Sequence, residues 1–428
     1  MQSTRKKPFM DSVVIGAALF AMFFGAGNMI FPAYLGKQAG PDWFSGFISY
    51  FLADIGLALV AIAAQIRLKE GDTPLSPLGN RFAGALMFAV MMCLGPFISI
   101  PRTAATTLEL SIQPLTDRVP TAVFCVAFFA LVLALCIKQS AVVDIVGKIL
   151  TPLLFVGLLV LIIKGIVTPL GTVSHYPTTD NAIADGIEAG YQSMDALAGL
   201  VFGTLIFEAV SGKGYTAPAA RRRVAAWASL VAGAGLCVVY LGMTWLGASV
   251  SALYGGHLSR TQLLIRLIGD LFPGNVGVIF FGVIAGLACL TTAIALTGSV
   301  ANYLTDLTRK KVPYPVWAAI LCVFSGAAAS LGVDRLVAIA APILNVAYPP
   351  ILITVLLRFL DRFLPPLSVR LAAVGALFIG LWDVLSSYID AIPTTSVLPL
   401  SSAGLGWIVP SLVLCAIGLF FSRLRKKA

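Results

Sequence analysis

The feature that most constrains this chain is a succession of twelve long apolar runs, separated by short segments that carry charge, Gly or Pro. A helix needs roughly 20 mostly apolar residues to cross a bilayer. Only 11% of the 428 residues are charged, against roughly 25% in soluble domains. The pattern predicts an all-α integral membrane protein with about twelve transmembrane helices, and it excludes a soluble or a disordered chain. The runs span approximately 11–35, 44–66, 82–111, 121–137, 145–167, 191–211, 225–250, 274–303, 314–332, 335–357, 370–389 and 403–422.

The positions of the basic residues orient these spans. With twelve spans, 22 of the 29 Lys and Arg residues fall on the side that carries both termini, six fall on the opposite side, and Arg102 lies inside a span. Such a bias marks the cytoplasmic side, so the net charge of +10 belongs to loops rather than to a nucleic-acid site. We therefore expect cytoplasmic tails at 1–10 and 423–428 and an external loop at 168–190. An amphipathic surface helix is expected within 251–272.

The first run contains a cluster of residues that can interrupt a helix. Gly25, Gly27 and Asn28 lie in mid-span, one turn before Pro32, and such a cluster unwinds a helix at low cost. Unwinding frees carbonyls that suit a cation or an ammonium group, and N–H groups that suit a carboxylate. Alternatively, the two glycines only allow close packing of helices.

The sixth run offers a second candidate break at Gly199 and Gly203, with Asp195 one turn earlier. Five spans separate the two candidates, so the chain would contain two inverted repeats, 11–167 and 191–357, followed by two further helices within 358–422. Paired interrupted helices are the best sequence indication of a transporter's binding site in mid-membrane.

A few ionisable residues lie within the spans, where each is costly and suggests a function or a structural partner. We expect Arg102 and Glu109, two turns apart in the third span, to face a cavity or a helix interface. Asp195 and Glu208 are also compatible with the membrane boundary. The full set is Asp54, Arg102, Glu109, Asp195, Glu208 and Asp383.

The eighth run places Ala288, Thr291 and Thr292 on one helix face. Two hydroxyls and a carbonyl supply neutral oxygens, which suit a weakly bound monovalent cation because hard cations prefer oxygen ligands. Hydroxyls in membrane helices also bond to preceding carbonyls of their own helix, which is the commoner situation for an isolated Thr pair.

Four segments in separate spans together resemble one known family. They are LFAMFFGAGNMIFP (19–32), GPFISIPRTA (95–104), YQSMDALAGLVFG (191–203) and LACLTTA (287–293). The sequence resembles the BrnQ-type branched-chain amino acid:cation symporters. The resemblance implies Na⁺-coupled, or in some members H⁺-coupled, uptake of Leu, Ile and Val across the bacterial inner membrane. It also implies the leucine-transporter fold, with five-plus-five inverted repeats, broken helices 1 and 6, and two extra helices.

The resemblance also implies site residues. The substrate carboxylate would meet N–H groups near Ala26 and Gly27. Its ammonium would meet carbonyls near Phe23, Phe24, Val201 and Phe202. The implied substrate site is Phe23, Phe24, Gly25, Ala26, Gly27, Asn28, Val201, Phe202 and Gly203. The implied Na⁺ ligands are the carbonyls of Ala21, Phe24 and Ala288 and the hydroxyls of Thr291 and Thr292.

Other functions remain as alternatives. A proton-coupled carrier would titrate Asp54, Asp195 or Lys148, although Lys148 also fits a positive-inside boundary. An intramembrane enzyme is not expected, because the sequence has no HExxH or GxSxG motif. A channel would need a symmetric filter, which the sequence does not show. The expected partners are an amino acid and the lipid bilayer, with no nucleic acid and no obligatory protein partner.

Overall fold

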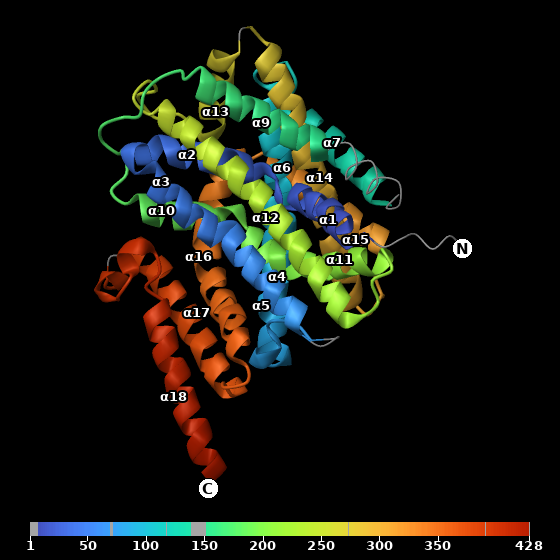
Figure 1. Ribbon diagram of the computed structural model, residues 1–428, viewed down its shortest axis with the longest axis vertical. Helices are drawn as coiled ribbons and strands as arrows, with labels where there is room; N and C mark the ends of the chain where they lie inside the picture. Colours follow the sequence, from blue (N-terminus) through green and yellow to red (C-terminus); the bar gives the residue numbers. More distant parts are fainter. Residues whose placement is uncertain are drawn as a thin grey trace.

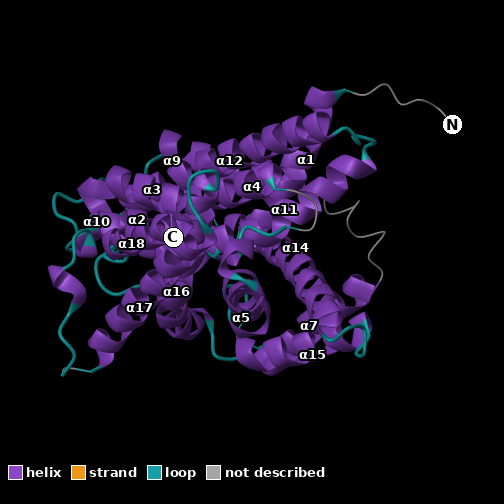
Figure 2. Cartoon of the chain, turned by 90° about the horizontal axis from the view of Figure 1, so that it is seen from below, coloured by secondary structure: helices purple, strands orange, loops and turns teal. Residues whose placement is uncertain are grey.

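A computed structural model describes residues 7–68, 72–116, 118–137, 151–272, 274–389 and 391–427. Within these ranges every regular element is a helix (Figures 1 and 2). Lys148 and residues 1–6 of the expected N-terminal tail lie outside the described residues.

Each expected apolar run coincides with one helix or with a pair of helices. Seven helical stretches in the described part are long and apolar enough to cross a membrane, and five shorter apolar helices accompany them. Runs 1 to 6 correspond to α1 (Pro8–Phe23) with α2 (Ala26–Ala39), α3 (Trp43–Phe51) with α4 (Leu57–Arg67), α5 (Asn80–Met92) with α6 (Ser99–Thr107), α7 (Thr121–Ile137), α9 (Thr151–Val167), and α10 (Ala182–Ser193) with α11 (Asp195–Gly212). Runs 7 to 12 correspond to α12 (Pro218–Ser249), α14 (Val276–Leu307), α15 (Tyr314–Ala329), α16 (Val333–Leu357), α17 (Pro366–Tyr388) and α18 (Ile408–Lys427).

The first run is broken at Phe24 and Gly25, which confirms an interruption at this cluster. Phe24 has ψ 94° and Gly25 is extended, with φ −123° and ψ −160°. Gly27 and Asn28, however, lie in the first turn of α2 and are not unwound. Pro32 is tolerated inside α2, where its missing N–H leaves the Asn28 carbonyl without a helical partner.

The sixth run is also broken, but not where its glycines predicted. The break lies at Met194, which adopts a left-handed conformation (φ 69°, ψ 14°) between α10 and α11. Gly199 and Gly203 are helical, and they allow α11 to pack closely on α4. A Cβ on Gly199 would lie 2.9 Å from the Ala58 carbonyl oxygen. Close packing therefore explains these glycines, and the prediction of a break at them was wrong.

The sixth run also begins earlier than expected. Asn181 accepts hydrogen bonds from the N–H groups of Ile183 and Ala184 and so caps α10 at Ala182. The external loop expected over 168–190 therefore contains the first turns of this helix.

Residues 260–271 form the expected amphipathic helix, α13 (Arg260–Leu271), with a capping box between Ser259 and Gln262.

The breaks are held inside a bundle by helices from both repeats. Helix α12 packs along both α1 and α2, and α10 packs on α3 and α2. The last two helices join the outside of this bundle, since α17 packs between α16 and α18 (Figure 1). Helix α18, coloured red, carries the C-terminal end away from the other helices.

The contact between α2 and α12 depends on two glycines that face each other's backbone. A Cβ on Gly36 would lie 1.9 Å from the Thr244 carbonyl oxygen, and a Cβ on Gly247 would lie 1.8 Å from the Ala33 carbonyl oxygen.

We expect Gly36→Ala and Gly247→Ala each to lower the free energy of unfolding by about 1–3 kcal/mol, because α2 and α12 must separate to make room for the added methyl group. Thermal unfolding of the purified protein measures this. Gly84→Ala is the control, because nothing lies within 4 Å of its added Cβ, and equal melting of all variants would contradict the packing argument.

Candidate functional site

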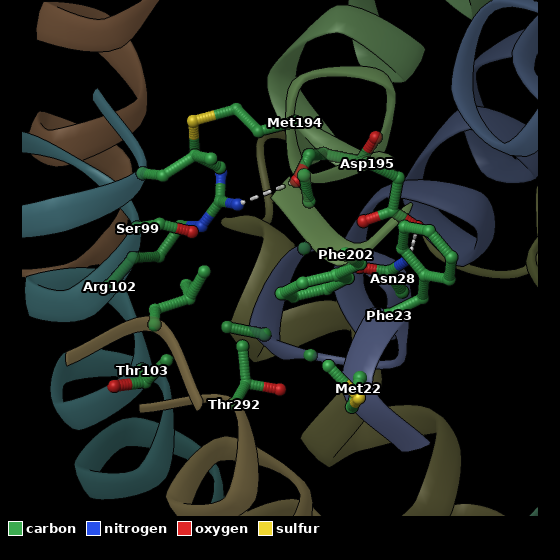
Figure 3. A pocket seen from close by; sticks show the side chains of 17 residues that line it. Met22, Phe23, Asn28, Ser99, Arg102, Thr103, Met194, Asp195, Phe202 and Thr292 are labelled. Atoms are coloured by element: carbon green, nitrogen blue, oxygen red, sulfur yellow. Dashed lines mark hydrogen bonds between the residues drawn. The ribbon is translucent and has the colours of Figure 1, made fainter. Parts of the chain in front are cut away.

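A small buried cavity lies where the two helix breaks meet α6 and α14 (Figure 3). Its volume of about 20 Å³ is enough for about one water molecule. The lining combines peptide groups at both breaks with charged, hydroxyl and apolar side chains. It comprises Met22, Phe23, Gly25, Ala26, Gly27, Asn28, Leu94, Ser99, Arg102, Thr103, Ser193, Met194, Asp195, Ala198, Phe202, Thr292 and Leu296.

Asn28 and Asp195 connect the two breaks directly. The Asn28 side-chain amide donates to Asp195 Oδ2 at 2.7 Å (Figure 3). The same amide also contacts the Tyr240 hydroxyl. Tyr240 in turn donates to the same Asp195 oxygen at 3.3 Å. Because Asp195 is the first residue of α11, its carboxylate lies at the positive end of that helix. One carboxylate thus joins α2, α11 and α12 in the middle of the protein.

A second carboxylate, Asp54, lies on the other side of the sixth-span break. It sits in a π-helical turn, Leu52–Gly56, which joins α3 to α4. The Ser193 hydroxyl donates to Asp54 Oδ1, whereas Oδ2 is buried and has no hydrogen-bond partner in the described part of the chain. Such a buried, half-satisfied carboxylate is costly in a protein interior.

Arg102 supplies the positive charge of this region. It is almost completely buried, and its guanidinium donates to the carbonyls of Gln192 at 2.6 Å and Ser193 at 3.3 Å. These carbonyls end α10, so Arg102 caps the half-helix electrostatically. The third span delivers Arg102 here because a π-helical turn around Pro96, with Gly95 outside helical geometry, bends it between α5 and α6. The cluster therefore holds one guanidinium and two carboxylates, which leaves room for one further positive charge when both carboxylates are ionised.

The structure brings together some of the expected substrate residues and not others. Phe23, Gly25, Ala26, Gly27, Asn28 and Phe202 line the cavity, and the rings of Phe23 and Phe202 lie 5.2 Å apart.

Phe24, Val201 and Gly203 do not line the cavity. The Phe24 ring stacks on Phe20 at 5.6 Å. The Val201 carbonyl lies within α11, where it accepts from the Thr204 hydroxyl, and Gly203 packs on Gln65. Because the break lies at Met194, the freed carbonyls belong to the end of α10 rather than to Val201 and Phe202.

The expected cation segment does meet the first break. The Thr292 hydroxyl lies 3.5 Å from the Phe24 carbonyl oxygen, and the Thr291 hydroxyl bonds to the Ala288 carbonyl at 2.8 Å. Ala21 lies in the last turn of α1, whose final carbonyls have no partner further along the helix. Thr291 thus bonds to its own helix, as such hydroxyls commonly do, yet the oxygens keep lone pairs that suit a monovalent cation.

The remaining ionisable residues serve other roles. Glu109 accepts from the Thr261 hydroxyl at 2.7 Å and from the Val333 N–H at 2.9 Å. It therefore ties the third span to α13 and to the start of α16, which confirms an interface role. Glu208 is exposed, and Asp383 lies exposed near the end of α17.

Sequence reasoning missed several residues of the site. Tyr240 lies within an apolar run, and its position gives no local signal of a polar partner. Ser99 precedes Arg102 by about one turn, Thr103 directly follows Arg102, and both line the cavity with it. Helical spacing would have found Ser99 from Arg102, and Thr103 from Ser99 four residues earlier. Ser193 and Met194 lie at the sixth-span break itself, which the glycine pattern predicted further along the chain, at Gly199 and Gly203.

The balance of buried charge predicts a measurable coupling between Arg102 and Asp195. Arg102→Met leaves two carboxylates without a counter-charge, and we expect it to cost about 3–5 kcal/mol of stability. Adding Asp195→Asn removes one of those charges. The double variant should therefore lose at least about 1 kcal/mol less than the sum of the single losses, as measured by thermal unfolding.

The exposed pair Arg266 and Asp270 on α13, 4.0 Å apart, is the control. The same substitutions there should couple by less than about 0.5 kcal/mol. Strict additivity at Arg102 and Asp195 would contradict the charge balance.

Known proteins resemble this chain over its whole length. Branched-chain amino acid permease BraB of Bacillus subtilis is 32% identical over 96% of this chain and 95% of its own length. The branched-chain amino acid transport system 3 carrier protein of Pseudomonas aeruginosa is 32% identical over 97% of both chains. Permease BrnQ of Salmonella typhimurium is 31% identical over 96% of both.

Solved structures of similar fold are more distant in sequence. A nucleobase-cation-symport-1 family transporter in a closed conformation aligns with a TM-score of 0.63 at 14% identity, covering 97% of this chain and 92% of that one. A substrate-bound, outward-open Na⁺-coupled sialic acid symporter aligns with a TM-score of 0.62 at 13% identity, covering 96% and 89%. These likenesses show the leucine-transporter fold. The family described as branched-chain amino acid transport protein matches residues 9–425, and the chain therefore belongs to that family.

Proposed function

We propose that this protein is a secondary active transporter that imports branched-chain amino acids together with Na⁺. The observation that carries the proposal is the pair of helix breaks that share a buried cavity with Arg102 and Asp195. The names of the curated relatives, all permeases or carriers of branched-chain amino acids, supply the substrate class.

The cavity offers separate partners for the two charges of an amino acid. The N–H groups that begin α2 have no helical acceptors and suit a carboxylate. Arg102 reinforces this end, since a Cβ on Gly27 would lie 3.0 Å from its Nη2 atom. Asp195 lies across the cavity and suits the ammonium group. In this arrangement Asp195 takes much of the role first expected of the Val201 and Phe202 carbonyls.

The aliphatic side chain would lie against the apolar wall formed by Met22, Phe23, Leu94, Phe202 and Leu296. Burying a Leu, Ile or Val side chain contributes roughly 1.5–3 kcal/mol. One methylene changes binding by only about 1–3 kcal/mol, so the three amino acids should share the site. A polar side chain would lose its hydrogen bonds to water here and should bind poorly.

Entry of a substrate requires the helices to move. A volume of 20 Å³ cannot hold leucine, so the described conformation is closed around the site. A wider hollow of about 280 Å³ lies beside it, lined in part by Phe31, Gln192 and Arg260. Arg260 bridges to Asp334 at 2.9 Å and lies over the Phe31 and Tyr34 rings of α2. Separation of these contacts would open the site on this side, and rocking of the repeats would open the other, as in alternating access.

Na⁺ would bind beside the substrate, at the carbonyls of Ala21, Phe24 and Ala288 and the hydroxyls of Thr291 and Thr292. The contact between Thr292 and the Phe24 carbonyl supports this set, because it joins α14 to the first break. A cation here would fix the break in one geometry and so favour substrate binding. The membrane potential adds about 2.3 kcal/mol per 100 mV for each inward charge.

A proton-coupled carrier is the second candidate, and Asp54 favours it. Its Oδ2 atom is buried and has no hydrogen-bond partner among the described residues. Protonation of Asp54 would therefore lower the cost of burying that oxygen and remove the excess negative charge of the cluster.

Either carrier would lie in the bacterial inner membrane with both termini cytoplasmic, as the basic residues indicate. Neither is an enzyme.

Uptake by purified protein in liposomes tests the coupling ion. With labelled leucine and separately imposed gradients, we expect a Na⁺ gradient to drive accumulation and a proton gradient alone to fail. Thr291→Ala and Thr292→Ala should each raise the Na⁺ concentration for half-maximal uptake about tenfold, the effect of losing roughly 1.4 kcal/mol of ion binding.

Ser299→Ala is the matched control, because among the described residues the Ser299 hydroxyl bonds only to the Ala295 carbonyl of the same helix. An unchanged Na⁺ dependence in both Thr variants would remove them from the ion site. Accumulation driven by protons without Na⁺, and lost in Asp54→Asn, would establish the second candidate instead.

A further inference from the structure

A second cavity, of about 260 Å³, lies away from the helix breaks, between α10, α16, α17 and the segment 395–407. It shares no lining residue with the central cavity. A neighbouring hollow of about 530 Å³ shares Asn345, Asp383, Thr395, Ser401 and Ser402 with it. The second cavity is therefore reached through a polar mouth near the end of α17, on the side where the charge distribution places the outside.

Two hydrogen-bond donors are buried at the wall of this cavity. Tyr191 and Trp407 are only 4% and 5% exposed. Neither the Tyr191 hydroxyl nor the Trp407 indole N–H makes a hydrogen bond of good geometry in the described part of the chain. The Trp407 indole N–H lies beside the Tyr191 oxygen and interacts with it, so the Tyr191 O–H is the donor best placed to serve a bound acceptor. A buried donor left unpaired costs free energy, which a bound acceptor would recover.

Two carboxylates line the same cavity. Asp383 is held by the Thr395 hydroxyl, and Glu188 projects from α10. Neither makes an ion pair within 4 Å among the described residues. Their negative charge is complementary to an ammonium group. The lining of the cavity also includes an apolar wall of Ile187, Pro349 and Ile379.

We propose that this cavity is an accessory site for a second zwitterionic amino acid with an apolar side chain. Its carboxylate would accept from the Tyr191 hydroxyl, its ammonium would pair with Glu188 and Asp383, and its side chain would contact the apolar wall. The choice of an amino acid as the ligand rests on the proposed function, whereas the site itself is argued from the lining of this cavity.

The accessory site is placed to influence the central one. Tyr191 stacks on Tyr348 with ring centroids 4.4 Å apart. It directly precedes Gln192, whose carbonyl accepts from Arg102. A ligand that fixes the Tyr191 side chain would therefore fix the last turn of α10, and with it the geometry of the sixth-span break.

Equilibrium binding of labelled leucine to the purified full-length protein tests the inference. We expect two leucines per chain. Asp383→Asn and Tyr191→Phe should each weaken one of them about tenfold or more, because each removes a hydrogen bond to a charged group. Asp195→Asn should weaken the other. Tyr348→Phe is the matched control, since its hydroxyl is likewise buried without a partner but does not line the cavity.

The outcomes separate the two claims. One leucine per chain, weakened by Asp195→Asn and unaffected by Asp383→Asn and Tyr191→Phe, would overturn the accessory site and leave the proposed function standing. One leucine that responds only to Asp383→Asn and Tyr191→Phe would support the accessory site and overturn the central one. Absence of leucine binding would overturn both.

Discussion

The structure depends on one constraint: peptide groups freed by a broken helix must find partners where no bulk water is present. At the sixth-span break, Arg102 takes the carbonyls of Gln192 and Ser193. At the first break, the Thr292 hydroxyl lies 3.5 Å from the Phe24 carbonyl oxygen, and the Asn28 side chain joins this break to Asp195. Each break is thus stabilised by a side chain from another span, so the two half-helix pairs form one unit with the third span.

This unit explains why charged residues are found so deep in the bundle. Arg102, Asp54 and Asp195 are almost fully buried, a placement that is costly unless the charges compensate one another. The cluster lacks one positive charge. A transporter that accepts an ammonium group, a metal ion or a proton at this point links occupancy of the site to the stability of the closed state.

Much of the fold could be predicted from the sequence because the thickness of the membrane fixes the length of each apolar run. The first break was found from its glycines. The sixth was misplaced, because a left-handed Met194 has no compositional signal, while Gly199 and Gly203 serve packing against α4. Tyr240 was not foreseen, since its partners are brought to it only by tertiary packing.

A structure of the purified protein in lipid nanodiscs with leucine and Na⁺ tests the central claim most directly. The account predicts leucine between the first turn of α2 and Asp195, with its carboxylate within hydrogen-bond distance of Arg102. Leucine bound elsewhere while this cavity stays closed, or a continuous helix through Phe24 and Gly25, would contradict it.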